Sequence, residues 1–253
     1  MPARFDSLDV LYEDNHLLAV NKPAMLPTMG VAEDRPSLLS VAKDYIRNKY
    51  HKPGNVYLGI VSRLDAPVTG VVLLARTSKA ASRLSQQFRE REVEKIYWAV
   101  VERGIEPREG RLIDFLRKDE RHRRMHVTNA AAEGAQRAEL NYRVLARDKE
   151  SGRQGDKETK LVRESPPLPL SLSPTLELLE VRPLTGRKHQ IRLQLSQAGF
   201  PIVGDRKYGS MRAFAAGIAL HSRRLVIEHP VSKMKLEFEA PIPAAWQRFR
   251  GTS

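Results

Sequence analysis

The chain has no cysteine, and this absence excludes disulfides, thiolate metal sites and cysteine nucleophiles. No apolar run comes near the roughly 20 residues that a membrane-spanning helix needs. The N-terminal stretch MPARFDSLDVLYEDNH contains no apolar secretory core. The seven histidines form no close cluster with the spacing of metal ligands. We therefore expect a cytoplasmic protein without a membrane segment and without a metal site.

What the chain has in excess is positive charge. Lysine and arginine number 43 against 30 acidic residues, which gives a formal net charge of +13. A surplus of this size favours a polyanionic partner, because each phosphate contact releases condensed counterions. The alternative is a basic protein whose charge only solvates its surface. On charge alone, nucleic acid is the favoured partner.

Short apolar segments with strand and helix periods follow one another along the chain. We expect strands over 9–14 and 17–23 around an Asn15–His16 turn, over 71–75, 94–102 and 176–184, and over 223–228 and 233–240 around a His229–Pro230 turn. We expect helices over 38–50 after a Ser37 cap, over 79–92 after a Ser78 cap, and across 185–205, where Gly199 as a left-handed cap and then Pro201 end the helix. This mixture indicates an α+β fold rather than regular βαβ repeats.

Residues 148–175 interrupt this pattern, since they are polar and then rich in proline and serine. We expect a flexible insert there, between two strands. A linker between domains is the alternative, but strand-like patterning resumes directly after the segment. A single domain over residues 1–253 is therefore favoured, and we find no internal repeat of solenoid or propeller spacing.

The stretch VSRLDAPVTGVVLLART, residues 61–77, places Asp65 in front of a buried apolar strand. A carboxylate in that position usually accepts hydrogen bonds in a turn. Arg63 lies two residues earlier, and in extended chain both side chains project to the same face. An adjacent arginine holds a partly buried carboxylate ionised, as a covalent nucleophile requires. Spacing alone leaves both roles open.

Two further residues fit either packing or chemistry. Arg192 lies beside the apolar face of the helix expected across 185–205, where an arginine can simply cover its apolar neighbours. Arg187, Lys188 and Arg192 stand near the start of that helix, where positive charge is unfavourable unless an anion is close. Tyr97 lies on the strand expected over 94–102, and most such tyrosines only pack within the sheet.

A basic run, LRKDERHRRMH, covers residues 116–126. Runs of this kind are often only a solvated face. In a chain with this net charge, the run is also the best local candidate for following a phosphate backbone. Its candidate phosphate-binding residues are Arg117, Lys118, Arg121, Arg123 and Arg124.

Five segments together resemble the RluA-type pseudouridine synthase family over nearly the whole chain. VNKPAMLP resembles its first motif, SRLDAPVTGVVLLART its HRLDxxTSGLLLxAK motif, and EKIYWAVVE its Lys-x-Tyr strand. GRKHQIRLQLSQAGFPIVGDRKYG resembles GRTHQIRxHLxxxGxPIxGDxxYG, and LHSRRLVIEHPVSKMKLEFEAPIP resembles the closing hairpin of the family. Several long motifs in this order are far more specific than the Arg-Leu-Asp triplet alone.

The resemblance implies a pseudouridine synthase catalytic domain with a mixed, mainly antiparallel sheet flanked by helices and loops. It implies that Asp65 is the catalytic aspartate, that Tyr97 is an active-site general base, and that Arg192 pairs with the aspartate. Arg63 matches the arginine associated with handling the flipped nucleotide. The RNA-binding residues expected outside the basic run are Arg63, Arg187, Lys188 and His189.

The chain departs from the family pattern around the aspartate. Ser62 stands where His is usual, Ala66 where a basic residue is common, and Val68–Thr69 where Thr-Ser is usual. We expect these neighbours to shape the loop and touch the RNA, and so to bear on substrate choice more than on the reaction. Because the chain starts directly at the catalytic motifs, we expect no appended N-terminal RNA-binding domain.

The implied function is isomerisation of specific uridines in structured ribosomal or transfer RNA, by base flipping and aspartate-dependent cleavage and re-formation of the glycosidic bond. No Walker loop or GxGxxG motif is found, and the resemblance implies no cofactor. RNA is the expected partner, and we expect a monomer. One alternative is a catalytically inactive RNA-binding relative that acts in ribosome assembly. Another is a nucleoside hydrolase or glycosidase, which ordinarily needs a second carboxylate.

Overall fold

The computed structural model describes residues 7–32, 35–102, 104–119, 124–148, 176–215 and 217–249. The insert expected at 148–175 lies outside these residues apart from its first position. Arg121 and Arg123 of the basic run also lie outside them. The expected single domain over 1–253 stays a prediction.

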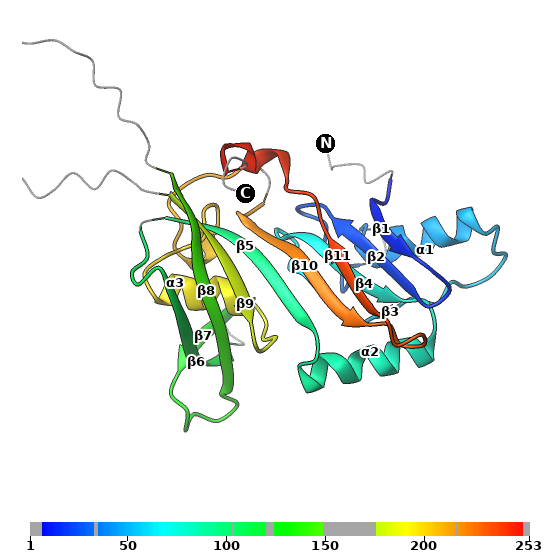
Figure 1. Cartoon of the computed structure of the whole chain (residues 1–253), viewed down its shortest axis with the longest axis horizontal. Helices are drawn as coiled ribbons and strands as arrows, with labels where there is room; N and C mark the ends of the chain where they lie inside the picture. The colour runs from blue at the N-terminus through cyan, green and yellow to red at the C-terminus, as the bar shows by residue number, and fades with distance from the viewer. Residues whose placement is uncertain are drawn as a thin grey trace, which may run out of the picture.

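The described part of the chain contains one 11-stranded sheet (Figure 1). Its strands are β1 (Val10–Glu13), β2 (Leu17–Lys22), β3 (Gly59–Ile60), β4 (Thr69–Ala75), β5 (Glu94–Glu102), β6 (Glu109–Asp119), β7 (Arg124–Thr128), β8 (Gln136–Asp148), β9 (Leu176–Pro183), β10 (Leu220–Glu228) and β11 (Lys235–Glu239). They are hydrogen-bonded in the order β1-β2-β4-β10-β5-β9-β8-β6-β7, with β3 added to β4 and β11 to β10. Only β4 and β10 run parallel among these pairs. The predicted α+β class with a mixed, mainly antiparallel sheet is confirmed.

Both hairpins expected from turn residues are present. β1 pairs with β2 across the Asn15–His16 turn, and the N–H groups of His16 and Leu17 both donate to the Asp14 carboxylate at 2.7 Å. β10 pairs with β11 across the turn that begins at His229 and Pro230. Turn chemistry that is local in sequence therefore predicted these strand pairings correctly.

Three α-helices and two short 3₁₀ helices accompany the sheet in the described residues: α1 (Leu38–Lys49), α2 (Ser78–Glu90), α3 (Gln190–Gln197), η1 (Arg206–Tyr208) and η2 (Ala244–Phe249). Ser37 caps α1, as predicted, in a reciprocal capping box with Ser40. The predicted Ser78 cap of α2 is wrong. Thr77 has the extended backbone of a cap and accepts a hydrogen bond from the Ala80 N–H at 3.2 Å, so Ser78 is already helical.

The helix expected across 185–205 is shorter than predicted at its start. α3 begins only at Gln190, because His189 has a left-handed backbone with φ 54° and turns the chain immediately before the helix. The predicted end is confirmed, since Gly199 has φ +92° and Pro201 follows it. Arg187 and Lys188 therefore lie in the loop ahead of α3 rather than on the helix.

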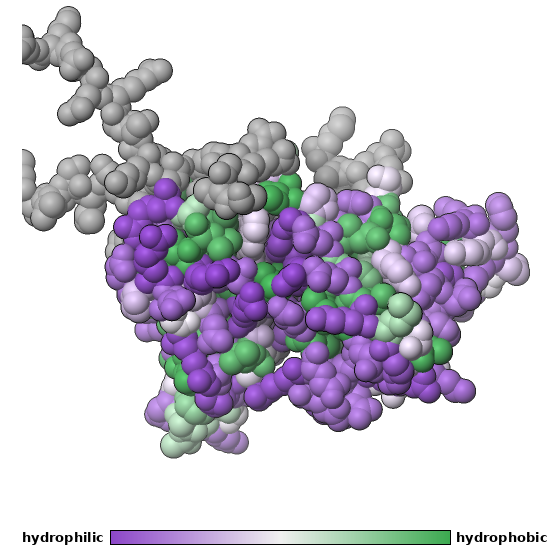
Figure 2. Space-filling view, in the orientation of Figure 1, coloured by the Kyte–Doolittle hydropathy of each residue, from purple (hydrophilic) through white to green (hydrophobic). Residues whose placement is uncertain are grey.

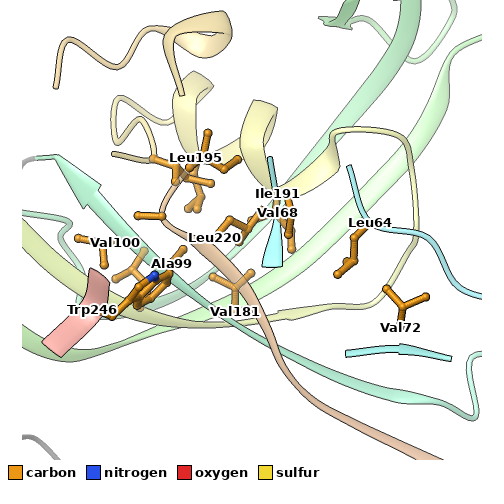
Figure 3. Close-up of a cluster of buried hydrophobic side chains, with 14 of the residues drawn as sticks. Leu64, Val68, Val72, Ala99, Val100, Val181, Ile191, Leu195, Leu220 and Trp246 are labelled. Atoms are coloured by element: carbon orange, nitrogen blue, oxygen red, sulfur yellow. The ribbon is translucent and has the colours of Figure 1, made fainter. Parts of the chain in front are cut away.

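The apolar core anchors the residues on either side of the candidate catalytic groups. Leu64 and Val68, which flank Asp65 in sequence, are buried in the same cluster as Ile191 of α3 (Figure 3). Leu220 of β10 and Val181 of β9 belong to this cluster as well. Burial of these neighbours fixes the backbone from which the polar side chains project.

The parallel pairing of β4 with β10 brings the Asp65 turn toward the centre of the sheet. Thr69 and Gly70 are registered with His221 and Ser222. Gly70 has φ +109°, and a Cβ there would collide with the Ser222 backbone, so only glycine permits this close approach. β5, which carries Tyr97, lies on the other side of β10. The turn and Tyr97 are thus separated by one strand.

Helices α1 and α2 lie toward the β1–β4 end of the sheet, and α3 lies toward the β6–β9 end (Figure 1). The view in Figure 2 shows hydrophilic residues over most of one face, with hydrophobic residues between them. Several arginines of the sheet pair with glutamates on neighbouring strands, namely Arg143 with Glu180, Arg182 with Glu94, and Arg224 with Glu94 and Glu237. None of the helices in the described ranges combines the length and apolar character that crossing a membrane requires.

Candidate active site

The three predicted catalytic residues meet in one cleft of about 830 Å³. Asp65 comes from the loop between β3 and β4, Tyr97 from β5, and Arg192 from α3. The cleft is also lined by the positively charged residues Arg63, Arg89, Arg91, Lys95, Arg187 and Lys188. Asp65 is the one acidic residue in its lining among the residues that the structure describes. The site is therefore a cationic cleft around a single carboxylate.

Asp65 is held by its backbone neighbours while its carboxylate stays accessible. Its carbonyl accepts a hydrogen bond from the Val68 N–H at 3.0 Å, which closes a tight turn. The Thr28 hydroxyl accepts from the Leu64 N–H at 3.1 Å and donates to the Leu64 carbonyl at 2.8 Å. The side chain of Asp65 remains 27% exposed. Asp65 thus belongs to a turn and also presents its carboxylate to the cleft.

Arg192 joins two carboxylates. Its Nη1 donates to Oδ2 of Asp65 at 2.8 Å, while Nε and Nη2 donate to the two oxygens of Asp205 at 2.6 and 2.8 Å. The guanidinium also lies 5.0 Å from the ring centroid of Tyr208. Burial by itself would lower the pKa of Arg192, but hydrogen bonds and the charges of Asp205 and Asp65 raise it above its ordinary value. The arginine is thus a fixed cation that orients the Asp65 carboxylate.

The described partners of the Asp65 carboxylate all contact Oδ2. Arg192 binds Oδ2, and Nε2 of His189 lies 3.6 Å from the same oxygen. Within the described part of the chain, Oδ1 has no hydrogen bond or ion pair. This asymmetry leaves one carboxylate oxygen available to a substrate in the cleft.

Tyr97 is present in the cleft as a neutral phenol. Burial, and then the negative charge of Asp65, raise its pKa to about 12 against the opposing effect of a side-chain hydrogen bond with Ser222. On β5, Tyr97 lines the cleft while its neighbour Ile96 is buried. At neutral pH the hydroxyl therefore carries its proton and is first a hydrogen-bond donor.

The residues predicted to bind RNA divide into two groups. Arg63, Arg187, Lys188 and His189 line the cleft. Arg117 and Lys118 lie on β6 and Arg124 on β7, where all three are exposed and outside the cleft lining. The structure thus brings the first group to Asp65 and places the second group on a separate hairpin.

Two of the departures from the family pattern have roles within the protein. The Ser62 hydroxyl accepts a hydrogen bond from the Leu73 N–H of β4 at 2.9 Å. Val68 is 2% exposed and packs in the core. These two side chains shape the loop, as predicted, by binding β4 and the core.

Sequence reasoning missed Lys22, which is fully buried at the end of β2. Its Nζ donates to the carbonyls of Pro23 and Leu26 at 2.8 Å each and of Ala66 at 3.0 Å. Burial lowers the pKa of Lys22 to about 7, and the charge of Asp65 acts in the opposite direction. An ammonium has three N–H groups for three acceptors, so the protonated lysine ties the residue after Asp65 to β2.

Asp205 and Tyr208 were also missed, although both stand in the quoted segment GFPIVGDRKYG. Asp205 is 1% exposed and holds Arg192 from the side opposite Asp65. The Tyr208 hydroxyl lies 2.7 Å from Nδ1 of His189. The sequence did indicate them, because Asp205 and Tyr208 match the Asp and the Tyr of the family motif GDxxYG. Their spacing, however, did not connect them with Asp65. Among the described residues, no three acidic or histidine side chains gather as a metal ion would require.

The fold and this cleft define a pseudouridine synthase type of protein. A family model described as RNA pseudouridylate synthase matches residues 16–197, so the chain belongs to that family. Its curated relatives include tRNA pseudouridine synthase C of Pectobacterium carotovorum subsp. carotovorum, which is 32% identical over 97% of this chain. This chain spans 62% of that relative's length. Ribosomal large subunit pseudouridine synthase D of Pseudomonas aeruginosa is 31% identical over 93% of this chain and 68% of its own length.

A solved structure supports the fold. The human RNA pseudouridylate synthase domain containing 4 superposes with a TM-score of 0.70 and 24% identity, covering 96% of this chain and 93% of the human one. The family resemblance predicted from the motifs is confirmed by the family model, and the solved structure shows the same fold.

Proposed function

We propose that the protein is an RNA pseudouridine synthase in which Asp65, Arg192 and Tyr97 are the catalytic residues. The observation that carries this proposal is the one carboxylate that lines a cationic cleft among the described residues, which is bound through Oδ2 to Arg192 and has no partner at Oδ1 within that part of the chain. A polyanion is attracted to such a cleft, and one defined oxygen is presented to it. Family membership supports the same reaction.

The reaction exchanges one glycosidic bond for another. The bond from ribose C1′ to uracil N1 breaks, the uracil turns, and a bond from C1′ to C5 forms. The hydrogen at C5 leaves as a proton and N1 gains a proton, so no oxidant or reductant is consumed. Oδ1 of Asp65 either attacks C1′ or assists departure of the base, and Arg192 holds the other oxygen of the carboxylate throughout.

Tyr97 acts on the base. Its ring packs against the extruded uracil, and its protonated hydroxyl donates a hydrogen bond to the base as charge develops on it. It can accept the C5 proton only after its own proton has moved, because the phenol is neutral at the start. Its role is therefore a proton relay rather than that of a free base.

The positive side chains of the cleft supply the binding energy for base flipping. Extruding a paired uridine costs a few kcal/mol of free energy, and contacts to the RNA backbone must offset this cost. Arg63, Arg89, Arg91, Lys95 and Lys188 line the cleft without an ion pair among the described residues, in contrast to the paired arginines of the sheet. We assign Arg117, Lys118 and Arg124 on the β6–β7 hairpin to contacts with RNA further from the flipped uridine.

A hydrolase is disfavoured by the position of the second carboxylate. Asp205 is close to Asp65 through their shared Arg192, but it is buried and both of its oxygens accept from that arginine. A carboxylate committed in this way cannot activate water, as an inverting glycosidase requires. The site instead suits a reaction in which the detached base is rejoined.

The relatives indicate two classes of RNA to test. The Pectobacterium relative is named for tRNA and the Pseudomonas relative for the ribosomal large subunit. We propose that the substrate is a uridine in structured RNA of one of these two classes, and that the enzyme works without a cofactor. A monomer suffices, because the cleft is built from one chain.

The test is release of tritium from RNA labelled at C5 of uridine, prepared from cells that lack the protein. Transfer and ribosomal RNA are assayed separately, with the wild type, Asp65→Asn and Asp44→Asn. Asp44 lies on α1 with its side chain 61% exposed, so this control removes a carboxylate far from the cleft. We expect release by the wild type and the control but not by Asp65→Asn. Binding of RNA without release by any variant would instead identify a catalytically inactive RNA-binding relative.

A further inference from the structure

A chain of polar contacts runs from β7 to the Asp65 carboxylate, and its first two links are hydrogen bonds. The Met125 N–H of β7 donates to the Tyr208 hydroxyl oxygen at 3.4 Å. The Tyr208 hydroxyl lies 2.7 Å from Nδ1 of His189, and Nε2 of His189 lies 3.6 Å from Oδ2 of Asp65. Met125 of β7 and Tyr208 of η1 are therefore linked in series, through His189, to one oxygen of Asp65.

The proton positions follow from the partners at each end. A lone pair on Nε2 would face a carboxylate oxygen and be repelled, so Nε2 carries the hydrogen. Nδ1 is then unprotonated and accepts a hydrogen bond from the Tyr208 hydroxyl. Tyr208 is consistent with this role, because burial raises its pKa and keeps the hydroxyl protonated. Each group therefore donates toward the next, from the Met125 N–H to Tyr208, from Tyr208 to His189, and from His189 toward Asp65.

His189 is a neutral imidazole in this arrangement. Burial lowers its pKa to about 4, while Asp65 opposes the change and the charges of Arg192, Lys207 and Lys188 reinforce it. Its side chain is 10% exposed. A neutral ring keeps a single N–H for Asp65, whereas a charged ring would also have to donate from Nδ1.

The backbone holds the ring rigidly. His189 has φ 54° and ψ 20°, a left-handed conformation that few residues other than glycine adopt, although histidine and asparagine adopt it more often than most. Its carbonyl accepts from the Leu193 N–H at 2.9 Å, and its ring meets the Tyr208 ring edge-on at 5.7 Å. Strained conformations of this kind persist where the surrounding structure enforces them, often at functional sites.

We propose that His189 is a positioning residue for Asp65 rather than an RNA contact. Its Nε2–H is aimed at Oδ2 of the carboxylate, which Arg192 also binds, so that Oδ1 alone faces the uridine. The 3.6 Å separation shortens to a hydrogen bond when RNA closes the cleft, as catalytic contacts commonly tighten on substrate binding. This inference rests on the proposed function of Asp65.

The test compares two amides that differ by one methylene. In His189→Gln the amide nitrogen reaches the place of Nε2, and in His189→Asn only that of Nδ1, while asparagine still tolerates the left-handed backbone. Tyr208→Phe removes the hydroxyl but keeps the ring against Arg192. Tyr142→Phe is the matched control, since that hydroxyl donates to the Pro107 carbonyl away from the cleft.

Single-turnover tritium release at saturating RNA is measured beside the Kd for RNA. We expect His189→Asn to lose about 10- to 100-fold in rate and Tyr208→Phe about tenfold, with Kd within about twofold of the wild type. His189→Gln recovers most of the rate, and Tyr142→Phe matches the wild type. Equal losses in the Gln and Asn variants, or a loss confined to Kd, would overturn the proposal.

Nitrogen-15 NMR of the wild-type imidazole at neutral pH is a second test that needs no variant to fold. We expect a protonated Nε2 and an unprotonated Nδ1 at His189. A doubly protonated ring, or the opposite tautomer, would overturn the proposal. If the wild type releases no tritium at all, the proposed function fails, and the NMR result still decides whether His189 directs a proton at Asp65.

Discussion

Replacing Asp205 by alanine would leave the Arg192 guanidinium partly unpaired in the interior. Asp205 is 1% exposed, and both of its oxygens accept hydrogen bonds from Nε and Nη2 of Arg192. The arginine side chain is itself 7% exposed, so water cannot take the place of the lost carboxylate. Asp65 would remain bound to Nη1 and would compensate part of the loss.

Removing one partner from a buried ion pair generally costs about 3–5 kcal/mol of unfolding free energy. Because Asp65 still pairs with the arginine, we expect the lower end of this range, about 3 kcal/mol. For a chain of this size, about 2–4 °C of melting temperature is lost per kcal/mol, which gives a decrease of about 6–12 °C. Tritium release should fall as well, since Arg192 loses the anchor that fixes its direction toward Asp65.

Urea unfolding monitored by circular dichroism measures the change, with Asp44→Ala, at an exposed side chain of α1, as the matched control. The double variant Arg192→Met with Asp205→Ala removes the unpaired charge and should recover stability to within about 1 kcal/mol of the wild type, yet release no tritium. The reasoning is refuted if Asp205→Ala costs no more than the control, or if the double variant is as unstable as the single one.

Three further predictions concern Tyr97 and Lys95, which line the cleft, and Gly70 of β4. The folded pKa of Tyr97 is raised from 10.0 to about 12, so the folded state favours the neutral phenol. The contribution of this group to the free energy of unfolding is therefore fully present below the unfolded pKa and is lost as the pH rises through the folded pKa. Between these two pKa values, the free energy of unfolding of the wild type should fall by about 1–2 kcal/mol relative to that of Tyr97→Phe, a loss reduced because the ring is partly exposed. A difference between the two proteins that does not change with pH would contradict this. Lys95→Gln should reduce the slope of log K for RNA against log salt by about 0.7–0.9, while Lys79→Gln on the exposed side of α2 should leave it unchanged. Gly70→Ala should cost at least about 2 kcal/mol in a melting experiment, because its Cβ meets the β10 backbone, whereas Gly54→Ala, with open space around it, should cost little; equal effects would refute the close approach.

Local patterning predicted most of the sheet. Short apolar patterns bounded by turn residues gave β5 and the hairpins at both ends of the described chain. It did not give the order of the strands. The parallel contact of β4 with β10 joins residues about 150 positions apart, and nothing in either strand specifies that partner.

Helix ends were predicted where a side chain or a glycine decides them locally. Ser37 and Gly199 are of this kind. The start of α3 is different, because His189 adopts its left-handed backbone under constraints from Tyr208 on η1 and Met125 on β7, which no local propensity encodes. The Ser78 error is smaller, since Thr77 and Ser78 both carry a capping hydroxyl and only the backbone angles distinguish them.

The predicted catalytic trio was brought together by the fold, but the residues that orient it were not foreseen, for one physical reason. Asp65 and Arg192 could be suspected because a charge beside an apolar pattern stands out in sequence. Lys22 and Asp205 are buried charges, and burial of a charge is tolerated only when its partners are fixed by tertiary structure. Lys22 donates to the Ala66 carbonyl 44 positions away, besides two carbonyls nearby, and Asp205 accepts from Arg192 of the preceding helix α3. Such residues are therefore invisible to patterning for the same reason that they are effective in the site: each one makes sense only after the segments carrying Asp65 and Arg192 have already packed together.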